Sequence, residues 1–335
     1  MRAFETAPAE VQEILNKPIC DLGLRLDGSP LDRFVQQLYR ECERKGLKHF
    51  KPPCYLTDEW GCPSGEPVVG IPFYLANPQL SKLEKEMNDL EDAREIMMYL
   101  RHEAGHAFNY AYELYKTPKW RKLFGPFRKA YRDNYRPVPF SRSYVRHMAG
   151  WYAQKHPDED FAETFAVWLT PRSRWRARYK GWPAMAKLNY MNRIAHKLGN
   201  TPPVRAQGDT DITVSEMRDT VANFYERLMA DEASFADLAL DSDLIDIFVS
   251  KRRRKGVRSG VEFLQKHRKA LIDKVTYWSG VQRPIIKKLV ESIQTRVEQL
   301  GLLVDTSCEP EHLTDITVYT TALAMNYLTR GKLQP

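Results

Sequence analysis

The stretch that most constrains the fold of this chain is RHEAGHAFNY, residues 101–110. It contains the pattern H-E-x-x-H, in which His102 and His106 stand four positions apart. On a helix these positions lie one turn apart on the same face, so both imidazoles can bind one cation. Neutral imidazole suits zinc, with bonds of about 2.0–2.1 Å, and a catalytic zinc keeps a position open for water. Glu103 follows the first histidine directly, which places its carboxylate within reach of that water as a general base.

The motif lies within a helical pattern that begins at Ser81. The stripe that runs through it consists of Leu83, Met87, Leu90, Ile96, Met97, Leu100, Ala104, Ala107 and Phe108. Gly105 interrupts the helix at a cost of about 1 kcal/mol relative to alanine. We expect another backbone or the metal site to approach closely there. The alternative is a pair of surface histidines on a charged helix.

The rest of the first two hundred residues mixes helices with short strands. Residues 31–46 have apolar positions at helical spacing, and Gly46 is a natural C-cap. Residues 52–78 are rich in Pro and Gly and predict short strands in a small sheet. A second helix is expected from Asp158 to Trp168, stopped by Pro171. These patterns predict an α+β fold.

The remainder of the chain predicts helices alone. Residues 199–211 are typical of a linker, residues 213–248 form an acidic amphipathic helical region, and residues 261–301 predict two further helices. We therefore expect an α+β domain over 1–204, followed by an all-α C-terminal domain over 205–335.

A zinc hydrolase needs a third protein ligand, and an acidic block offers candidates. Residues 156–168 read HPDEDFAETFAVW, in which Glu159 and Glu163 are one turn apart on one helical face. By this argument Asp160 and Glu163 compete with Glu159 as the ligand. His147 and His156, just before the block, are candidates for substrate binding or proton transfer, although a lone histidine near a helix start is more often structural.

At these residues the chain resembles the bacterial zinc-binding metallopeptidases, which are gluzincin-type zincins distantly similar to the protease domain of anthrax lethal factor. The resemblance covers roughly residues 50–175. It rests on RHEAGHAFNY, on GWYAQKHPDEDFAETFAVWL (150–169) and on IPFYLANP (71–78).

The resemblance implies a zincin-like metallopeptidase domain, in which a small sheet accompanies the active-site helix. It implies that Glu159 is the third zinc ligand beside His102 and His106, and that Glu163 orients a ligand histidine. A tyrosine seven residues before the ligand glutamate corresponds to Tyr152, whose phenol would hydrogen-bond the oxyanion of the reaction intermediate. The chain would then be a zinc-dependent hydrolase of peptide bonds, with Glu103 and Tyr152 as its catalytic residues.

Positive charge is concentrated in the part of the chain that holds the motif. Residues 101–200 carry 20 Lys and Arg against 7 Asp and Glu, whereas residues 1–100 have a net charge of −5 and residues 201–335 have none. Arg172, Arg174, Arg176 and Arg178 alternate directly after the acidic block. Such a field steers anionic substrates, so we expect an acidic peptide or protein as the substrate. The alternatives are a solvated basic face or a dock for the chain's own acidic segment 209–246.

The patch KRRRKGVR, residues 251–258, is of the kind that binds phosphates. The region around it carries no net charge and no recognised nucleic-acid motif. Nucleic-acid binding is therefore an alternative function, as is partner binding on an inactive zincin scaffold. Glu103 argues against the inactive scaffold, because a site without a reaction has no need of a base.

Composition predicts a cytoplasmic protein. No run of eighteen apolar residues occurs, so we expect no membrane span. Residues 1–20 carry Glu5, Glu10 and Glu13 and no apolar stretch, so we expect no secretory signal. Five cysteines at irregular spacing favour reduced thiols, and the spacing of Cys54 and Cys62 is poor for a zinc site.

Overall fold

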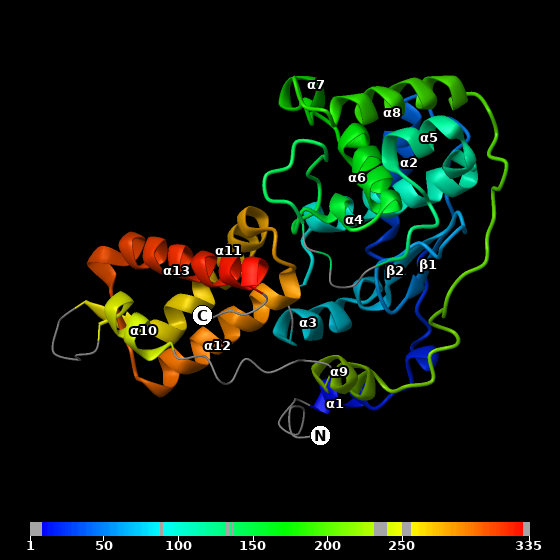
Figure 1. The fold of residues 1–335 in the computed structure, drawn as a ribbon. Coiled ribbons are helices and arrows are strands. Elements are labelled where there is room, and N and C mark those ends of the chain that lie inside the picture. The colour runs from blue at the N-terminus through cyan, green and yellow to red at the C-terminus, as the bar shows by residue number, and fades with distance from the viewer. Residues whose placement is uncertain are drawn as a thin grey trace. The chain divides into compact units, whose positions relative to one another are not determined.

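The computed structural model divides the chain into two compact units (Figure 1). It describes residues 9–87, 90–131, 135, 137–230, 240–249 and 256–330. The first unit comprises Met1–Tyr135, Ser141–Met148 and Tyr152–Glu232, and the second comprises Arg136–Phe140, Ala149–Trp151 and Ala233–Pro335. The division into domains 1–204 and 205–335 stays a prediction, and residues 205–232 group with the first unit.

The first unit is mainly helical and contains one small sheet, which agrees with the predicted α+β class. Its α-helices are α1 Ala9–Leu15, α2 Asp32–Arg44, α3 Pro78–Met87, α4 Ala93–Ala111, α5 Pro118–Phe124, α6 Pro157–Leu169, α7 Trp175–Arg178, α8 Met185–Leu198 and α9 Val221–Ala230. Its 3₁₀ turns are η1 Ile19–Leu22, η2 Phe73–Ala76, η3 Leu114–Lys116 and η4 Tyr152–Gln154.

The sheet confirms the strands expected in the Pro- and Gly-rich segment. Strand β1, Cys54–Thr57, pairs in parallel with β2, Val69–Pro72. All four residues of β2 are buried. Gly61 forms an antiparallel bridge with Gly70, so the connection between the two strands returns alongside β2.

The helical pattern from Ser81 through the motif forms two helices, so the expected continuous stripe is interrupted. The side chain of Asp92 accepts hydrogen bonds from the backbone N–H groups of Arg94 and Glu95, and Glu95 accepts one from the backbone N–H of Asp92. This reciprocal capping satisfies donors that a helix start leaves open, and it therefore begins a new helix, α4, ahead of the motif.

Helix α6 confirms the helix that was predicted from Asp158 to Trp168, extended by one residue at each end. His156 is its N-cap residue, with Nδ1 accepting a hydrogen bond from the backbone N–H of Asp158 at 3.2 Å. Pro157 stands in the first turn, where its missing N–H costs nothing.

Helices α4 and α6 pack backbone against backbone. A Cβ atom added at Gly105 would lie 2.7 Å from Cα of Ala162 and 2.9 Å from its carbonyl oxygen, which is too close for any side chain. The close approach expected at Gly105 is therefore confirmed, and its partner is α6. Every residue of α6 is buried, so the acidic block lies inside the unit.

The core around α4 is aromatic on one side and ionic on another. The ring of Phe108 lies 5.1 Å from that of Phe50 and 5.2 Å from that of Phe165, measured between centroids. Arg101 donates two hydrogen bonds, of 2.7 and 2.8 Å, to the buried carboxylate of Glu41. This bidentate pair ties α2 to the helix that carries the motif.

The second unit contains α10 Asp241–Ile247, α11 Gly260–Ser279, α12 Arg283–Gln299, α13 Glu309–Arg330, η5 Thr306–Cys308 and the strands β3 Val257–Ser259 and β4 Leu303–Asp305. The two helices expected over 261–301 are present as α11 and α12. The expectation of an all-α region needs correction, because β3 and β4 form an antiparallel pair. Gly256 directly precedes β3 and Gly301 stands two residues before β4, and both have the left-handed φ that glycine adopts without steric cost.

Within the described ranges, no helix combines the length and the apolar character that a membrane crossing requires. All five cysteines are free, as expected. The basic residues 251–255 lie outside the described residues, and Arg258 next to them pairs with Glu309 at 3.6 Å.

Candidate metal centre

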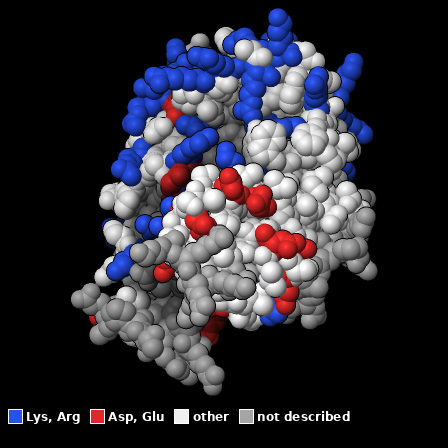
Figure 2. Space-filling model, turned by 90° about the vertical axis from the view of Figure 1, so that its left-hand side faces the viewer, with Lys and Arg blue, Asp and Glu red and all other residues white. Residues whose placement is uncertain are grey.

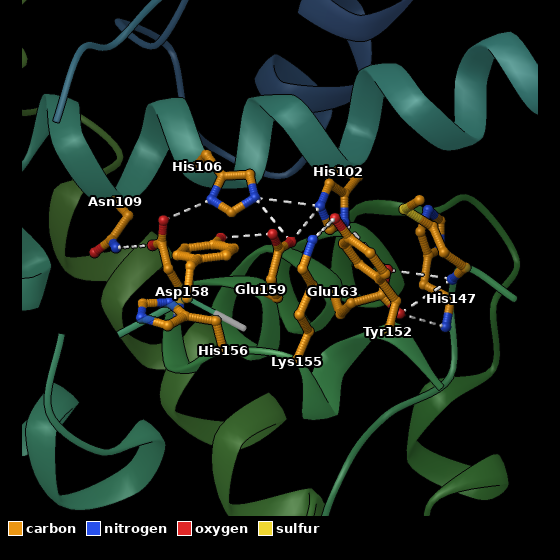
Figure 3. A network of polar contacts seen from close by, with 12 residues as sticks. His102, His106, Asn109, His147, Tyr152, Lys155, His156, Asp158, Glu159 and Glu163 are labelled. Carbon is orange, nitrogen blue, oxygen red and sulfur yellow. Dashed lines mark hydrogen bonds and ion pairs between the residues drawn. The ribbon is translucent and has the colours of Figure 1, made fainter. Parts of the chain in front are cut away.

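Side chains from α4 and α6 meet where the two helices pack. Figure 3 shows His102 and His106 pointing from α4 toward Glu159 on α6. Oε2 of Glu159 lies 2.9 Å from Nε2 of His102 and 3.2 Å from Nε2 of His106. The two Nε2 atoms are themselves 3.2 Å apart. These three buried side chains form a group that could hold a metal ion.

Each histidine is held at its other ring nitrogen by a separate carboxylate. Nδ1 of His102 lies 3.1 Å from Oε1 of Glu163, and Nδ1 of His106 lies 2.8 Å from Oδ2 of Asp158. A carboxylate can only accept a hydrogen bond, so when the rings are neutral these partners favour the tautomer with its proton on Nδ1. This tautomer directs the lone pair on each Nε2 toward Glu159.

In this neutral tautomer three acceptor atoms converge: Nε2 of His102, Nε2 of His106 and Oε2 of Glu159. Their lone pairs repel one another unless a proton or a cation lies among them. Two imidazoles and one carboxylate are a ligand set that catalytic zinc sites use, with a further position for water or substrate. The carboxylates behind the histidines are the partners that metal-binding histidines require. The residues present therefore fit a zinc ion.

The electrostatics of the group favour positive charge. Burial opposes protonation of His102, but hydrogen bonds to Glu159 and Glu163 outweigh it and raise the pKa of His102 to about 9. Burial opposes protonation of His106 as well, yet Asp158 and Glu159 raise its pKa well above the usual value. For Glu159, burial opposes ionisation, but the two histidines hold its pKa well below its ordinary range. Surroundings that attract protons this strongly also attract a metal cation.

Glu103 faces the same cavity as the three candidate ligands. Burial raises the pKa of Glu103, while His102 and His106 partly oppose that rise. A carboxylate with a raised pKa is a stronger base. The cavity has a volume of about 220 Å³ and is lined by Trp60, Gly61, Cys62, Ser64, His102, Glu103, His106, Tyr110, Tyr131, Tyr152, Asp158 and Glu159.

Tyr131 and Tyr152 belong to the lining of the cavity, and Lys155 lies beside Tyr152. The ring of Tyr152 lies 5.6 Å from that of His102, measured between centroids. Burial, followed by the nearby carboxylates, raises the pKa of Tyr152, so its phenol keeps the proton and can donate it in a hydrogen bond. Tyr131 donates to Oε1 of Glu159 at 2.6 Å, and Nζ of Lys155 lies 3.5 Å from the phenol oxygen of Tyr152.

The two rivals of Glu159 have other partners. Asp160 pairs with Lys187 at 2.6 Å, and both side chains are buried. Glu163 contacts His102 through Nδ1, and its Oε2 accepts hydrogen bonds of 3.0 Å from the backbone N–H groups of His147 and Met148.

His147 and His156 have structural contacts. Nε2 of His147 lies 3.0 Å from the carbonyl oxygen of Met98, and burial lowers the pKa of this imidazole. His156 caps α6 through Nδ1, and its Nε2 lies 2.7 Å from the carbonyl oxygen of Lys129. Neither residue lines the cavity.

Residues 72–180 match the model of a protein family described as "Putative zinc-binding metallo-peptidase". The matched stretch runs from the end of β2 to just beyond α7, so it contains both helices of the site and every site residue predicted from the sequence. No curated protein and no solved structure matches the chain. The gluzincin subtype and the likeness to lethal factor stay predictions.

Asp158 was not among the site residues predicted from the sequence. Besides His106, it contacts Asn109, which donates a hydrogen bond to it at 2.7 Å, and the phenol of Tyr110, which also donates to it. Asn109 and Tyr110 stand three and four positions after His106, so helical spacing could have identified this face of α4. No signal in the sequence identified Tyr131, because its contact with Glu159 depends on the path of the loop between α5 and α6.

Proposed function

We propose that this chain is a zinc-dependent metallopeptidase with a gluzincin-type, zincin-like first domain. His102, His106 and Glu159 would hold the zinc. The observation that carries the proposal is the convergence of their three acceptor atoms in a cavity that Glu103 also faces. When bound, zinc would polarise the carbonyl to be cleaved and lower the pKa of a water molecule to about 7. The family match over residues 72–180 supports a peptide bond as the target.

The chain's own residues would carry the proton transfers. The carboxylate of Glu103 takes a proton from the attacking water and later passes it to the leaving amine. The phenol of Tyr152 donates a hydrogen bond to the carbonyl oxygen as it becomes negative. Glu163 and Asp158 keep the two ligand imidazoles in the tautomer and orientation that binding requires.

We further propose a preference for acidic peptides and a cytoplasmic location. The concentration of Lys and Arg in residues 101–200 supports the preference, because such a field attracts anionic substrates. Free thiols at all five cysteines support the location, since disulfides are rare in the cytoplasm.

Metal analysis of purified variants tests the ligand assignment. We expect wild type to hold zinc in a one-to-one ratio and Glu159→Ala to lose it. Glu163→Ala should still bind zinc, but more weakly. Glu113→Ala, which removes a carboxylate that pairs with Lys116 away from the site, serves as the matched control and should bind like wild type. If Glu159→Ala keeps its zinc while Glu163→Ala loses it, the assignment is wrong.

Peptide cleavage tests the reaction. The zinc-loaded chain is incubated with a peptide library and with unfolded proteins, and new termini are identified by mass spectrometry. Glu103→Gln, loaded with zinc, is the blank. Cuts that appear with wild type and not with the blank support the peptidase. A zinc-loaded chain that cuts nothing beyond the blank contradicts it.

A further inference from the structure

A second cavity, of about 310 Å³, lies next to the C-terminal end of α6. Four cationic side chains line it, Lys45, Arg172, Arg174 and Arg176, and its lining contains no Asp or Glu. We refer to this cavity as the arginine pocket. All of its lining residues belong to the first unit. Lys and Arg cover much of the upper end of this unit, where α7 and α8 lie (Figure 1 and Figure 2).

Among the described residues no acidic side chain forms an ion pair with any of the four cations, and the only carboxylate that raises the pKa of Lys45 is that of Glu41, which pairs with Arg101. Nζ of Lys45 donates to the carbonyl oxygen of Trp168 at 2.7 Å, at the end of α6. A helix C-terminus carries only about half a negative charge, which one lysine more than balances. Burial, followed by the charge of Arg176, lowers the pKa of Lys45. Three arginines therefore remain without a counterion.

The backbone of the pocket is held in a costly conformation. Arg172 and Arg174 have φ of 58° and 47°, in the left-handed region. This conformation is unfavourable for any residue other than glycine, because Cβ crowds the following carbonyl oxygen. Such strain occurs preferentially where a ligand is held. The guanidinium of Arg176 lies 4.1 Å above the ring of Trp175, which restricts its movement before any ligand arrives.

We propose that the arginine pocket is an exosite that binds the carboxylates of an acidic segment of the peptide substrate. Guanidinium groups match carboxylates with two parallel hydrogen bonds, so several arginines in one cavity select for clustered acidic side chains. The role in cleavage rests on the proposed peptidase function. The binding of acidic peptide does not, because the pocket shares no residue with the metal centre.

The length of α6 limits how many residues separate the acidic segment of the substrate from the cleaved bond. From Glu159 to Leu169 the helix rises roughly 15 Å, at about 1.5 Å per residue. An extended peptide covers about 3.3 Å per residue. The acidic side chains therefore lie about five residues or more from the cleaved bond, and an acidic residue directly beside that bond does not reach the pocket.

Peptide binding tests the exosite without relying on catalysis. Fluorescence anisotropy at low salt compares a labelled Glu-rich peptide with its Gln-rich counterpart on the whole, chelator-treated chain. The test variant is Arg172→Gly/Arg174→Gly, since glycine adopts the left-handed conformation freely and the fold is not put at risk. The control is Lys119→Ala/Lys122→Ala on α5, which removes the same charge from exposed positions of the same unit.

We expect wild type to prefer the Glu-rich peptide. The glycine variant should bind it about tenfold more weakly, because it loses one or two charge-assisted hydrogen bonds to the peptide. The control should lose no more than a small part of the affinity, by screening of distant exposed charges. Equal losses in both variants would show a diffuse field in place of a site and would overturn the proposal.

Two further probes separate the sources of the anion. If inorganic phosphate displaces the peptide at concentrations similar to those at which the peptide itself binds, the pocket is a site for free oxyanions. A single-stranded oligonucleotide that binds wild type more tightly than the Glu-rich peptide, and fails to bind the glycine variant, would make it a nucleic-acid surface. Either result overturns the assignment to acidic peptide.

Cleavage kinetics then test the spacing. Substrates carry a Glu pair either next to the cleaved bond or about six residues away. In the zinc-loaded wild type, the distant pair should lower KM and leave kcat unchanged, as expected for binding away from the reaction. The glycine variant should lose this advantage. An advantage for the adjacent pair alone would contradict the exosite.

Discussion

Acidic side chains lie at the first turn of α6 and cationic side chains lie beyond its last turn. The two groups differ in whether the fold pairs them with opposite charge. At the first turn, Asp158, Glu159 and Asp160 are buried, and each faces a basic side chain of α4 or α8. At the other end, the three exposed arginines and the half-buried Lys45 of the arginine pocket form no ion pair within the described residues. Both arrangements have the sign that the helix dipole favours. They differ in whether the fold supplies the counterion.

The difference follows from the cost of burying charge. A buried charge without a partner destabilises a fold by several kcal/mol, so the acidic end must be matched group by group. The matched groups become a fixed site for a cation. Exposed charges cost little, because water and salt screen them. The arginine pocket can therefore remain without a counterion until a ligand supplies one.

The largest effect is expected at Glu103, beside the acidic end. Glu103→Gln removes the general base, and kcat for peptide cleavage should fall about 10²–10⁴-fold. Zinc content, measured on the same preparation, should stay at the wild-type level, because Glu103 is not among the candidate ligands. A fall of less than tenfold with zinc retained would assign the base to another residue.

A pair of lysines tests the comparison directly. Lys187→Met leaves Asp160 buried without its partner and should reduce the free energy of unfolding by about 3 kcal/mol. Lys45→Met removes one hydrogen bond to a backbone carbonyl and should cost about 1 kcal/mol. Urea denaturation measures both. If both variants lose the same free energy of unfolding, the acidic end of α6 is not the only end at which buried charges need a partner.

The cost of Lys187→Met should depend on pH. Burial raises the pKa of Asp160 to about 7, although Lys187 lowers it in part. A carboxyl whose pKa is higher in the folded state binds a proton on folding, so its contribution to stability is lost as pH rises through the folded pKa. Without Lys187 that pKa rises further, and the deficit should grow above pH 7. A deficit that is the same at pH 5 and pH 8.5 would contradict this account.

Asp158→Ala tests the carboxylate that orients His106. Loss of such a partner typically weakens metal binding about 10–100-fold. Competition with a chelator of known zinc affinity measures the change, and Glu113→Ala is again the control. Zinc affinity equal to that of wild type would show that Asp158 has no part in orienting the ligand.

The smallest effect is expected at the cationic end. Arg174→Gly should leave stability unchanged or raise it by up to about 1 kcal/mol, because glycine relieves the left-handed strain. Arg193→Gly, an exposed position within α8, is the matched control and should lose about 1 kcal/mol. Loss of stability in Arg174→Gly similar to that of the control would show that Arg174 is needed for the fold.

Local periodicity grouped the candidate ligands on each helix, whereas the choice of Glu159 over Asp160 and Glu163 came from the family resemblance. The spacing of His102 and His106, and of Glu159 and Glu163, places each pair on one helical face, and this depends only on the helix repeat. The cost of Gly105 within a helix was enough to predict a close neighbour. The start of α4 at Asp92 was missed, although Asp92 and Glu95 form a capping box that is visible in the sequence.

The sequence by itself therefore determined which residues stand on the two site helices and on which faces. The tertiary structure decided which groups meet: Glu159 with both imidazoles, Asp158 with His106, Tyr131 with Glu159, and Lys187 with Asp160. These partners lie about 27 to 57 residues apart in the chain. Their pairing depends on how α4 and α6 pack against each other at Gly105 and Ala162. The pattern of residues along one helix does not determine this packing.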